Sequence, residues 1–151
     1  SPELPAEVDA LLARDAVQAL AMANKAGLVV SGFAKVEALA QAGRAAAVIA
    51  ASDGAEDGKR KIGQALRRAP VAKEIPVVAI FAAAELELAL GREHVIHAAL
   101  APGPATEGFL ARWRRLIRFR MNDAGETASI DPVESDTRDQ TKTEPAGPKA
   151  E

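Results

Sequence analysis

The residues best placed to do chemistry lie in the segment Val30-Ser-Gly-Phe-Ala-Lys-Val36. Ser31 and Gly32 are residue types that often precede the first turn of a helix, and Lys35 falls within that turn. The first turn of a helix has backbone N–H groups without helical partners and a partial positive charge, so it attracts anions such as phosphate. The segment therefore predicts a phosphate-binding helix start, and nucleic acid is the first partner to consider.

Simpler interpretations stand beside this one. Ser31 and Gly32 can be a helix cap and nothing more, and Lys35 can be a solvated side chain. The same choice applies at Gly91 and Arg92, where glycine is typical of a helix end and arginine can bind phosphate.

Two further basic runs have alternatives of their own. A basic helix surface in the middle of the chain is typical of a solvated face, whereas an arginine-rich helix near residue 113 can bind a polyanion through salt-sensitive contacts. Trp113 is expected in the core rather than as a base-stacking platform. The arginine-rich helix can also pair with carboxylates of the acidic C-terminal segment, which would then mimic nucleic acid. The basic surface in the middle of the chain consists of Lys59, Arg60, Lys61, Arg67 and Arg68. The arginines of the arginine-rich helix are Arg112, Arg114, Arg115, Arg118 and Arg120.

Charge is divided unevenly along the 151 residues. Residues 122–151 hold eight acids and three bases, a net charge of −5, whereas residues 1–121 hold sixteen bases and thirteen acids, a net charge of +3. The first part is therefore mildly basic, which permits nucleic-acid binding without requiring it. No apolar run reaches the roughly 18 residues of a membrane span and no secretory signal is visible, so we expect a cytoplasmic protein without a membrane partner.

Catalytic and metal-binding patterns are missing. The chain has no cysteine, no Gly-x-Gly-x-x-Gly after a strand, no Walker loop and no Gly-x-Ser-x-Gly elbow. Asp53 follows an apolar run but is spaced to cap a helix together with Glu56. His94 and His97 are expected on one strand, pointing to opposite faces, where they cannot share a metal. We therefore expect no enzyme activity, no cofactor and no metal.

Helical periodicity and apolar runs alternate along the chain. Buried strands flanked by helices predict an α/β fold, a three-layer α/β/α sandwich with a mixed sheet of about four strands. Residues 1–121 are expected to form this domain, and residues 122–151, which are rich in Asp, Glu, Ser, Thr, Pro and Gly, a disordered acidic tail. The predicted helices are 7–26, 32–41, 55–68 (ended by Pro70), 82–90 and 104–121, and the predicted strands are 28–30, 46–51, 75–81 and 94–100.

Several strings, in order and at matching spacing over 15–100, resemble a known superfamily. They are Ala21-Met-Ala-Asn-Lys-Ala-Gly27, Val30–Val36, Ala51-Ser-Asp-Gly-Ala-Glu-Asp57 with Lys59-Arg60-Lys61, and Ala89-Leu-Gly-Arg-Glu-His-Val95. This region resembles the ribosomal-protein superfamily of the L-seven-Ae and L-thirty-e type, which binds kink-turn RNA. Within the bacterial branch it looks like the domain that follows a YlxR-type nucleic-acid-binding domain. Because the chain begins at Ser1 without Met, we expect a fragment or a processed form.

The resemblance implies contact with structured RNA, ribosomal RNA or a related transcript, through the start of the second helix and the loop before the last strand. Kink-turn binders begin that helix with Gly-x-Asn-Glu and carry a later Lys. Here Gly32 matches, whereas Ala34, Lys35 and Ala38 replace the Asn, Glu and Lys. The residues expected to contact RNA are Lys25, Ser31, Gly32, Phe33, Ala34, Lys35, Gly91 and Arg92.

The expected function is therefore a non-catalytic RNA-binding module. A protein-interaction module is the alternative, since the base-reading Asn and Glu are replaced, and a small-molecule enzyme of unknown type is a weaker third.

Overall fold

The computed structural model describes residues 4–69 and 74–128, which form helices and strands in alternation. Their order agrees with the sequence prediction, and most boundaries fall within a few residues of it. The helices are α1 (Leu4–Lys25), α2 (Phe33–Gln41), α3 (Glu56–Arg67), α4 (Ala83–Leu90) and α5 (Pro104–Ala128), and the strands are β1 (Val29–Ser31), β2 (Ala47–Ala50), β3 (Val77–Val78) and β4 (His97–Leu100).

The four strands form one mixed sheet in the order β1-β4-β2-β3. β4 is antiparallel to both β1 and β2, whereas β3 is parallel to β2. The last strand in the sequence is thus inserted between the first two. This arrangement brings the residues just before β4 beside the end of β1, because Ser31 is in register with Ala98.

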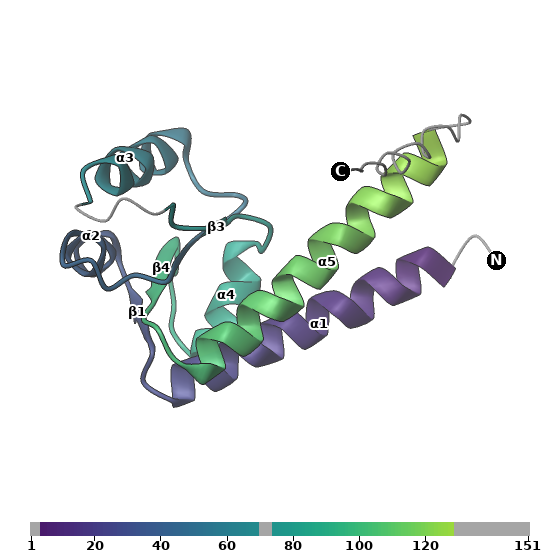
Figure 1. Cartoon of the computed structure of the whole chain (residues 1–151), viewed down its shortest axis with the longest axis horizontal. Helices are drawn as coiled ribbons and strands as arrows, with labels where there is room; N and C mark the ends of the chain where they lie inside the picture. The colour runs from purple at the N-terminus through teal and green to yellow at the C-terminus, as the bar shows by residue number, and fades with distance from the viewer. Residues whose placement is uncertain (1–3, 70–73, 129–151) are drawn as a thin grey trace, which may run out of the picture. The chain divides into compact units, whose positions relative to one another are not determined.

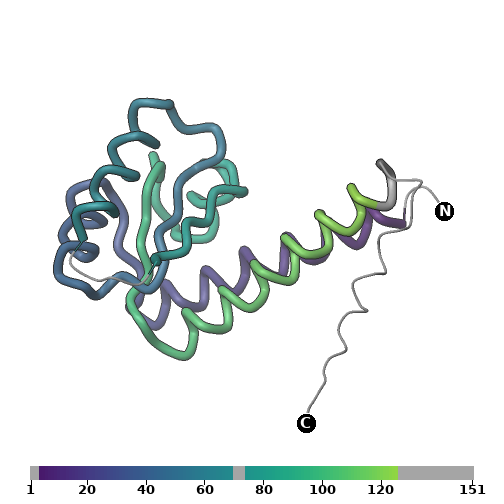
Figure 2. Tube along the Cα trace, turned by 45° about the horizontal axis from the view of Figure 1, so that its top comes forward, coloured from purple at the N-terminus to yellow at the C-terminus, as the bar shows by residue number. Residues whose placement is uncertain are grey.

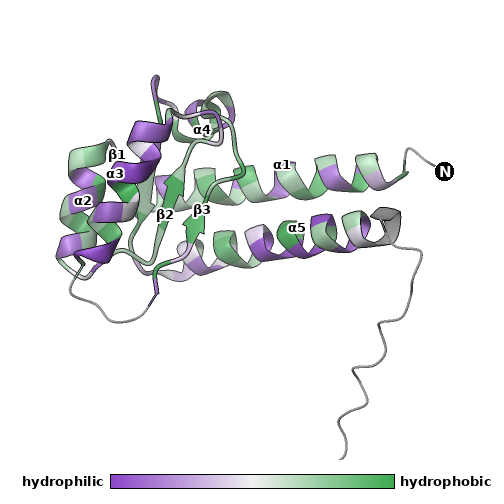
Figure 3. Ribbon diagram, turned by 90° about the horizontal axis from the view of Figure 1, so that it is seen from above, coloured by the Kyte–Doolittle hydropathy of each residue, from purple (hydrophilic) through white to green (hydrophobic). Residues whose placement is uncertain are grey.

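Helices cover both faces of the sheet, which confirms the predicted three-layer α/β/α sandwich (Figure 1). α2 and α3 lie on one face, and α1, α4 and the first part of α5 on the other. Seen from above, β2 and β3 are coloured as hydrophobic while α3 presents a mostly hydrophilic surface (Figure 3). This contrast is the one expected when strands are covered on both sides and each helix buries a single face.

Alternation along the strands divides the core into two clusters. Ile49 and Leu100 point to the larger cluster beneath α1, α4 and α5, whereas Val48 and Ala99 point to the smaller one beneath α2 and α3. The larger cluster contains the fully buried side chain of Phe109, and Trp113 packs partly buried against it, as expected. The many alanines of β2 and β4 leave room for helices to pack closely on both faces.

The part of α5 up to residue 117 runs beside α1 in two views (Figures 1 and 2). An ion pair joins them, between Arg112 Nε and Asp15 Oδ2 at 3.4 Å. Internal contacts divide the described residues into two units, one ending at Ile117 and the other beginning at Arg118. α5 continues to Ala128 rather than ending at Met121, because residues 122–128 contain two alanines and no proline to break the helix. The rest of the predicted tail, residues 129–151, lies outside the described residues, as does Pro70.

β2 is shorter than predicted by one residue at each end, and β3 and β4 are shorter by three residues or more. β3 comprises only Val77 and Val78, because Pro76 has no N–H to donate, although its carbonyl still accepts from Val48 N–H at 3.0 Å. β4 begins at His97 rather than His94, which lies in the preceding loop with φ 60°. The prediction that both histidines share a strand was therefore wrong.

The prediction that Asp53 caps the helix immediately after it, α3, was also wrong. α3 begins after Ala55, and no side chain caps it. Asp53 Oδ1 instead accepts a hydrogen bond from Ala83 N–H, at 2.9 Å, in the first turn of α4. The carboxylate thus stabilises a helix start thirty residues away in sequence.

The described residues contain neither a candidate membrane span nor a candidate metal centre. None of the helices in the described ranges has both the length and the apolar composition that a membrane crossing requires. Within the same residues, no cluster of three or more His, Asp or Glu side chains is arranged to hold a metal ion.

Candidate functional site

Two helices, α2 and α3, begin at one edge of the sheet. The chain leaves β1 at Ser31 to enter α2, and leaves β2 at Ala50 on the way to α3. β4 begins at this edge with His97, which is in register with Ala50. Because β1 and β2 are both antiparallel to β4, the starts of α2 and α3 lie at the same edge of the sheet as the loop before β4.

The start of α2 carries no side-chain cap. Its N-cap residue is Gly32, with φ 99° and ψ 143°, a backbone conformation that favours glycine. Gly32 was expected to contact RNA, but its N–H donates to the His97 carbonyl at 2.9 Å and is therefore not free to bind phosphate. The first intrahelical donor is Val36 N–H, which binds the Gly32 carbonyl at 3.0 Å. The N–H groups left without helical acceptors are those of Phe33, Ala34 and Lys35.

Arg92 lies against this helix start. Its Nη1 donates to Ser31 Oγ at 2.7 Å, across 61 residues of sequence. Gly91 ends α4 in the left-handed conformation, φ 64°, so the chain turns sharply and delivers Arg92 toward β1. The glycine is a helix end, as its simpler interpretation held, and Ser31 binds Arg92 rather than capping α2.

A polar cavity of about 320 Å³ opens beside this contact. Asn24 belongs to its lining and was not among the predicted site residues, although it stands in one of the strings that carry the resemblance. Its side-chain amide donates to the Leu90 carbonyl at 3.3 Å, which connects the end of α1 to the end of α4. The lining residues are Asn24, Val29, Val30, Ser31, Lys35, Leu90 and Arg92.

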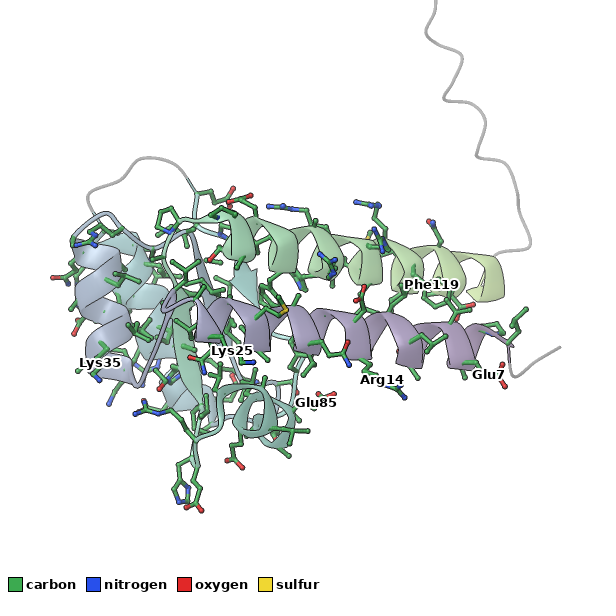
Figure 4. The ribbon with its side chains drawn as sticks, turned by 90° about the horizontal axis from the view of Figure 1, so that it is seen from below. Glu7, Arg14, Lys25, Lys35, Glu85 and Phe119 are labelled. Atoms are coloured by element: carbon green, nitrogen blue, oxygen red, sulfur yellow. The ribbon has the colours of Figure 1, made fainter. Side chains whose placement is uncertain are left out.

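Other predicted residues border the region without lining the cavity. Lys25 is exposed in the last turn of α1, where a cation also complements the helix dipole. Ala34 is exposed on α2, whereas Phe33 is half-buried and packs against His97. Figure 4 shows Lys25 and Lys35 on the face seen from below, with Arg14 further along α1.

The cations of this region differ from those of α3 in their pairing. Among the described residues, no carboxylate forms an ion pair with Lys25, Lys35 or Arg92. On α3, by contrast, Lys59, Arg60 and Lys61 are all matched. Lys59 lies 3.7 Å from Glu56, and the other two bind Asp57. The first part of the α3 basic run is thus a self-paired, solvated surface, and unpaired positive charge is found where α2 begins.

The buried histidine of the region is His97, a residue that is 8% exposed. Its ring meets the Phe33 ring edge to face, with centroids 6.2 Å apart. Burial lowers the pKa of the His97 imidazole below its ordinary value, because a low-dielectric environment disfavours the charged form. His97 is therefore neutral at pH 7, and it adds no charge to the site.

Comparison with known proteins identifies the fold of this chain but no more specific relationship. No protein-family model and no curated protein sequence matches the chain. A solved structure of a protein with unknown function from Bacillus halodurans C superposes with a TM-score of 0.58 at 20% identity, covering 66% of this chain and 96% of that one. The Giardia lamblia 15.5kD RNA binding protein superposes with a TM-score of 0.54 at 18% identity, covering 72% and 89%. At such identities the similarity establishes a shared fold.

Proposed function

We propose that this chain is a non-catalytic module that binds structured RNA. The observation that carries the proposal is the Arg92–Ser31 hydrogen bond, because it joins the loop before β4 to the start of α2. A guanidinium bonded to a neutral hydroxyl keeps its full charge available for a phosphate oxygen. The proposal is supported by the fold shared with the Giardia lamblia RNA binding protein.

The phosphate contacts follow from the groups in the cavity. Lys35 and Arg92 line it from α2 and from the loop, and the first-turn N–H groups of α2 lie at the same helix start. Gly32 leaves open space, since an added Cβ would meet no atom within 4 Å. Such groups bind a backbone by charge and hydrogen bonds, and they fix the position of an RNA without reading its bases. The shape of this surface would depend on Ser31, Gly91 and Phe33. Its border would be formed by Ala34 and Lys25.

The finer identity belongs to the same proposal. We place the chain in the L-seven-Ae and L-thirty-e superfamily, in its bacterial branch, beside a YlxR-type domain in a cytoplasmic protein. Ribosomal RNA or a related transcript is the expected ligand. With Ala34 and Lys35 at the two base-reading positions, we expect kink-turn RNA to be bound as backbone rather than by guanine recognition.

The test compares charge reversals at matched positions. Lys35→Glu and Arg92→Glu alter the cavity, whereas Arg14→Glu makes the same charge change on the exposed surface of α1. Filter binding uses labelled total cellular RNA, a model kink-turn RNA and a plain hairpin, each at about 50 and 200 mM salt. The two cavity variants are expected to bind several-fold more weakly, with the salt slope reduced by about one, and Arg14→Glu to change little.

Two results would contradict the proposal. Equal weakening by Arg14→Glu would mean that net charge, rather than the cavity, governs retention. Absence of salt-sensitive retention of any of the RNAs would favour a protein partner instead.

A further inference from the structure

We propose that His97 is a positioning residue through which pH regulates RNA binding: its neutral side chain holds the start of α2 in place, and protonation releases it. The inference rests on the proposed function for its biological meaning, but the coupling between His97 and α2 is a property of the protein alone.

His97 contacts the start of α2 in two independent ways. Its carbonyl oxygen accepts the Gly32 N–H at 2.9 Å, and its ring packs against Phe33 with 69° between the ring planes. Gly32 and Phe33 are the N-cap and first residue of α2. A displacement of His97 therefore moves the N–H groups proposed to bind phosphate.

α3 also packs closely against the imidazole. A Cβ placed on Gly58 would lie 3.2 Å from His97 Cε1 and 3.4 Å from Nε2. Glycine at position 58 thus leaves just enough space for the ring, which lies between the two helices. Within the described part of the chain, the buried Nε2 atom has no hydrogen-bond partner.

This packing suits a neutral ring and not a charged one. A neutral imidazole can leave Nε2 as an unprotonated acceptor, but an imidazolium carries N–H donors on both nitrogens. A buried charged donor without an acceptor is costly. The groups seen against the ring, Phe33 and the Gly58 backbone, offer no side-chain oxygen. Protonation must therefore be accompanied by movement of α2 or α3, so that water reaches Nε2.

Within the described residues, no charged group of the surrounding elements is hydrogen-bonded to the buried Nε2 atom. β1 and β2 contain no charged residue. α2 contributes Lys35, which is exposed, and Glu37, which is half-buried one turn beyond Phe33. On the first turns of α3, the Asp57 carboxylate is bound by Arg60 and by Lys61, the latter at 3.5 Å; Glu56 pairs with Lys59.

The experiment exploits the fact that the chain has only two histidines. In the His94→Gln variant, His97 is the sole imidazole. RNA affinity is measured with the model kink-turn RNA between about pH 7.5 and pH 5.5. We expect affinity to fall several-fold on acidification, and to become independent of pH when His97→Leu is added. Affinity that stays constant or rises in His94→Gln on acidification, or that falls equally in the double variant, would overturn the proposal.

A second measurement needs neither RNA nor a folded His97 variant. NMR follows the His97 ring protons and the backbone amides of Phe33, Ala34 and Lys35 in the His94→Gln protein. The amide signals are expected to shift with the same midpoint as the ring, while the amide of Arg14 on α1 stays constant. Amide signals that ignore the His97 titration would refute the coupling. RNA that fails to bind at every pH would instead refute the proposed function and leave this measurement to decide the coupling.

Discussion

Arg92 Nη1 and Ser31 Oγ lie 2.7 Å apart, and this hydrogen bond connects the loop before β4 to the end of β1. Ser31 is in register with Ala98 on β4, so antiparallel pairing fixes the distance between the two segments. Neither residue is paired with a carboxylate among the described residues, so the cation faces the polar cavity with its charge uncompensated.

Removing the Ser31 hydroxyl tests whether it orients Arg92. Ser31→Ala is expected to weaken RNA binding a few-fold, because the guanidinium must then be immobilised on binding. In an Arg92→Ala background the same change is expected to have no effect. The double-mutant cycle is measured by RNA titration at constant salt. Additive losses would show that the two side chains act separately. Stability should change by at most about 1 kcal/mol, since the hydrogen bond is exposed.

Asp53→Ala tests which helix the carboxylate stabilises. Loss of the hydrogen bond to Ala83 N–H is expected to cost about 1 kcal/mol of unfolding free energy, measured by denaturant titration. Hydrogen exchange should accelerate in the first turn of α4 and stay unchanged in the first turn of α3. Faster exchange at Glu56 and Asp57 alone would restore the cap that the sequence pattern had suggested.

Two glycine-to-alanine substitutions are expected to have opposite signs. Gly91→Ala introduces a side chain at φ 64° and should destabilise the protein by about 1 kcal/mol, although the space around it is open. Gly63→Ala lies inside α3, where a Cβ meets only the end of the Arg67 side chain at 3.4 Å, and should stabilise by up to about 1 kcal/mol. Thermal unfolding of both variants checks the pair. Equal shifts would mean that backbone conformation at position 91 is unimportant.

Stability is expected to fall as the pH drops through the range below about 6.5. Burial lowers the pKa of His97 in the folded state, so the unfolded chain binds the proton more readily and acid favours unfolding. Above the unfolded-state pKa both forms are neutral, and this contribution to the pH dependence vanishes. The free energy of unfolding, followed against pH, should retain this slope in His94→Gln and lose it in His97→Leu. A slope that disappears in His94→Gln would assign the effect to the exposed histidine.

The sequence by itself determined the order of the elements and where most of them begin and end. The apolar run at residues 45–51 predicts a strand, and the glycine after α4 predicts a helix end. Each signal depends on residues only a few positions apart, so a local pattern is sufficient to predict these elements. The α/β/α layers follow, because uniformly apolar strands must be covered on both faces.

Tertiary structure decided which polar groups meet. The partner of Gly32 N–H is His97, that of Arg92 is Ser31, and that of Asp53 is the start of α4. Each pair is separated by thirty or more residues, and insertion of β4 between β1 and β2 brings the first two pairs together. A sequence pattern depends on residues that are close along the chain, so it cannot identify a hydrogen-bond donor or acceptor that is distant in sequence. The burial of His97 between α2 and α3 could likewise be known only once both helices were packed on the sheet.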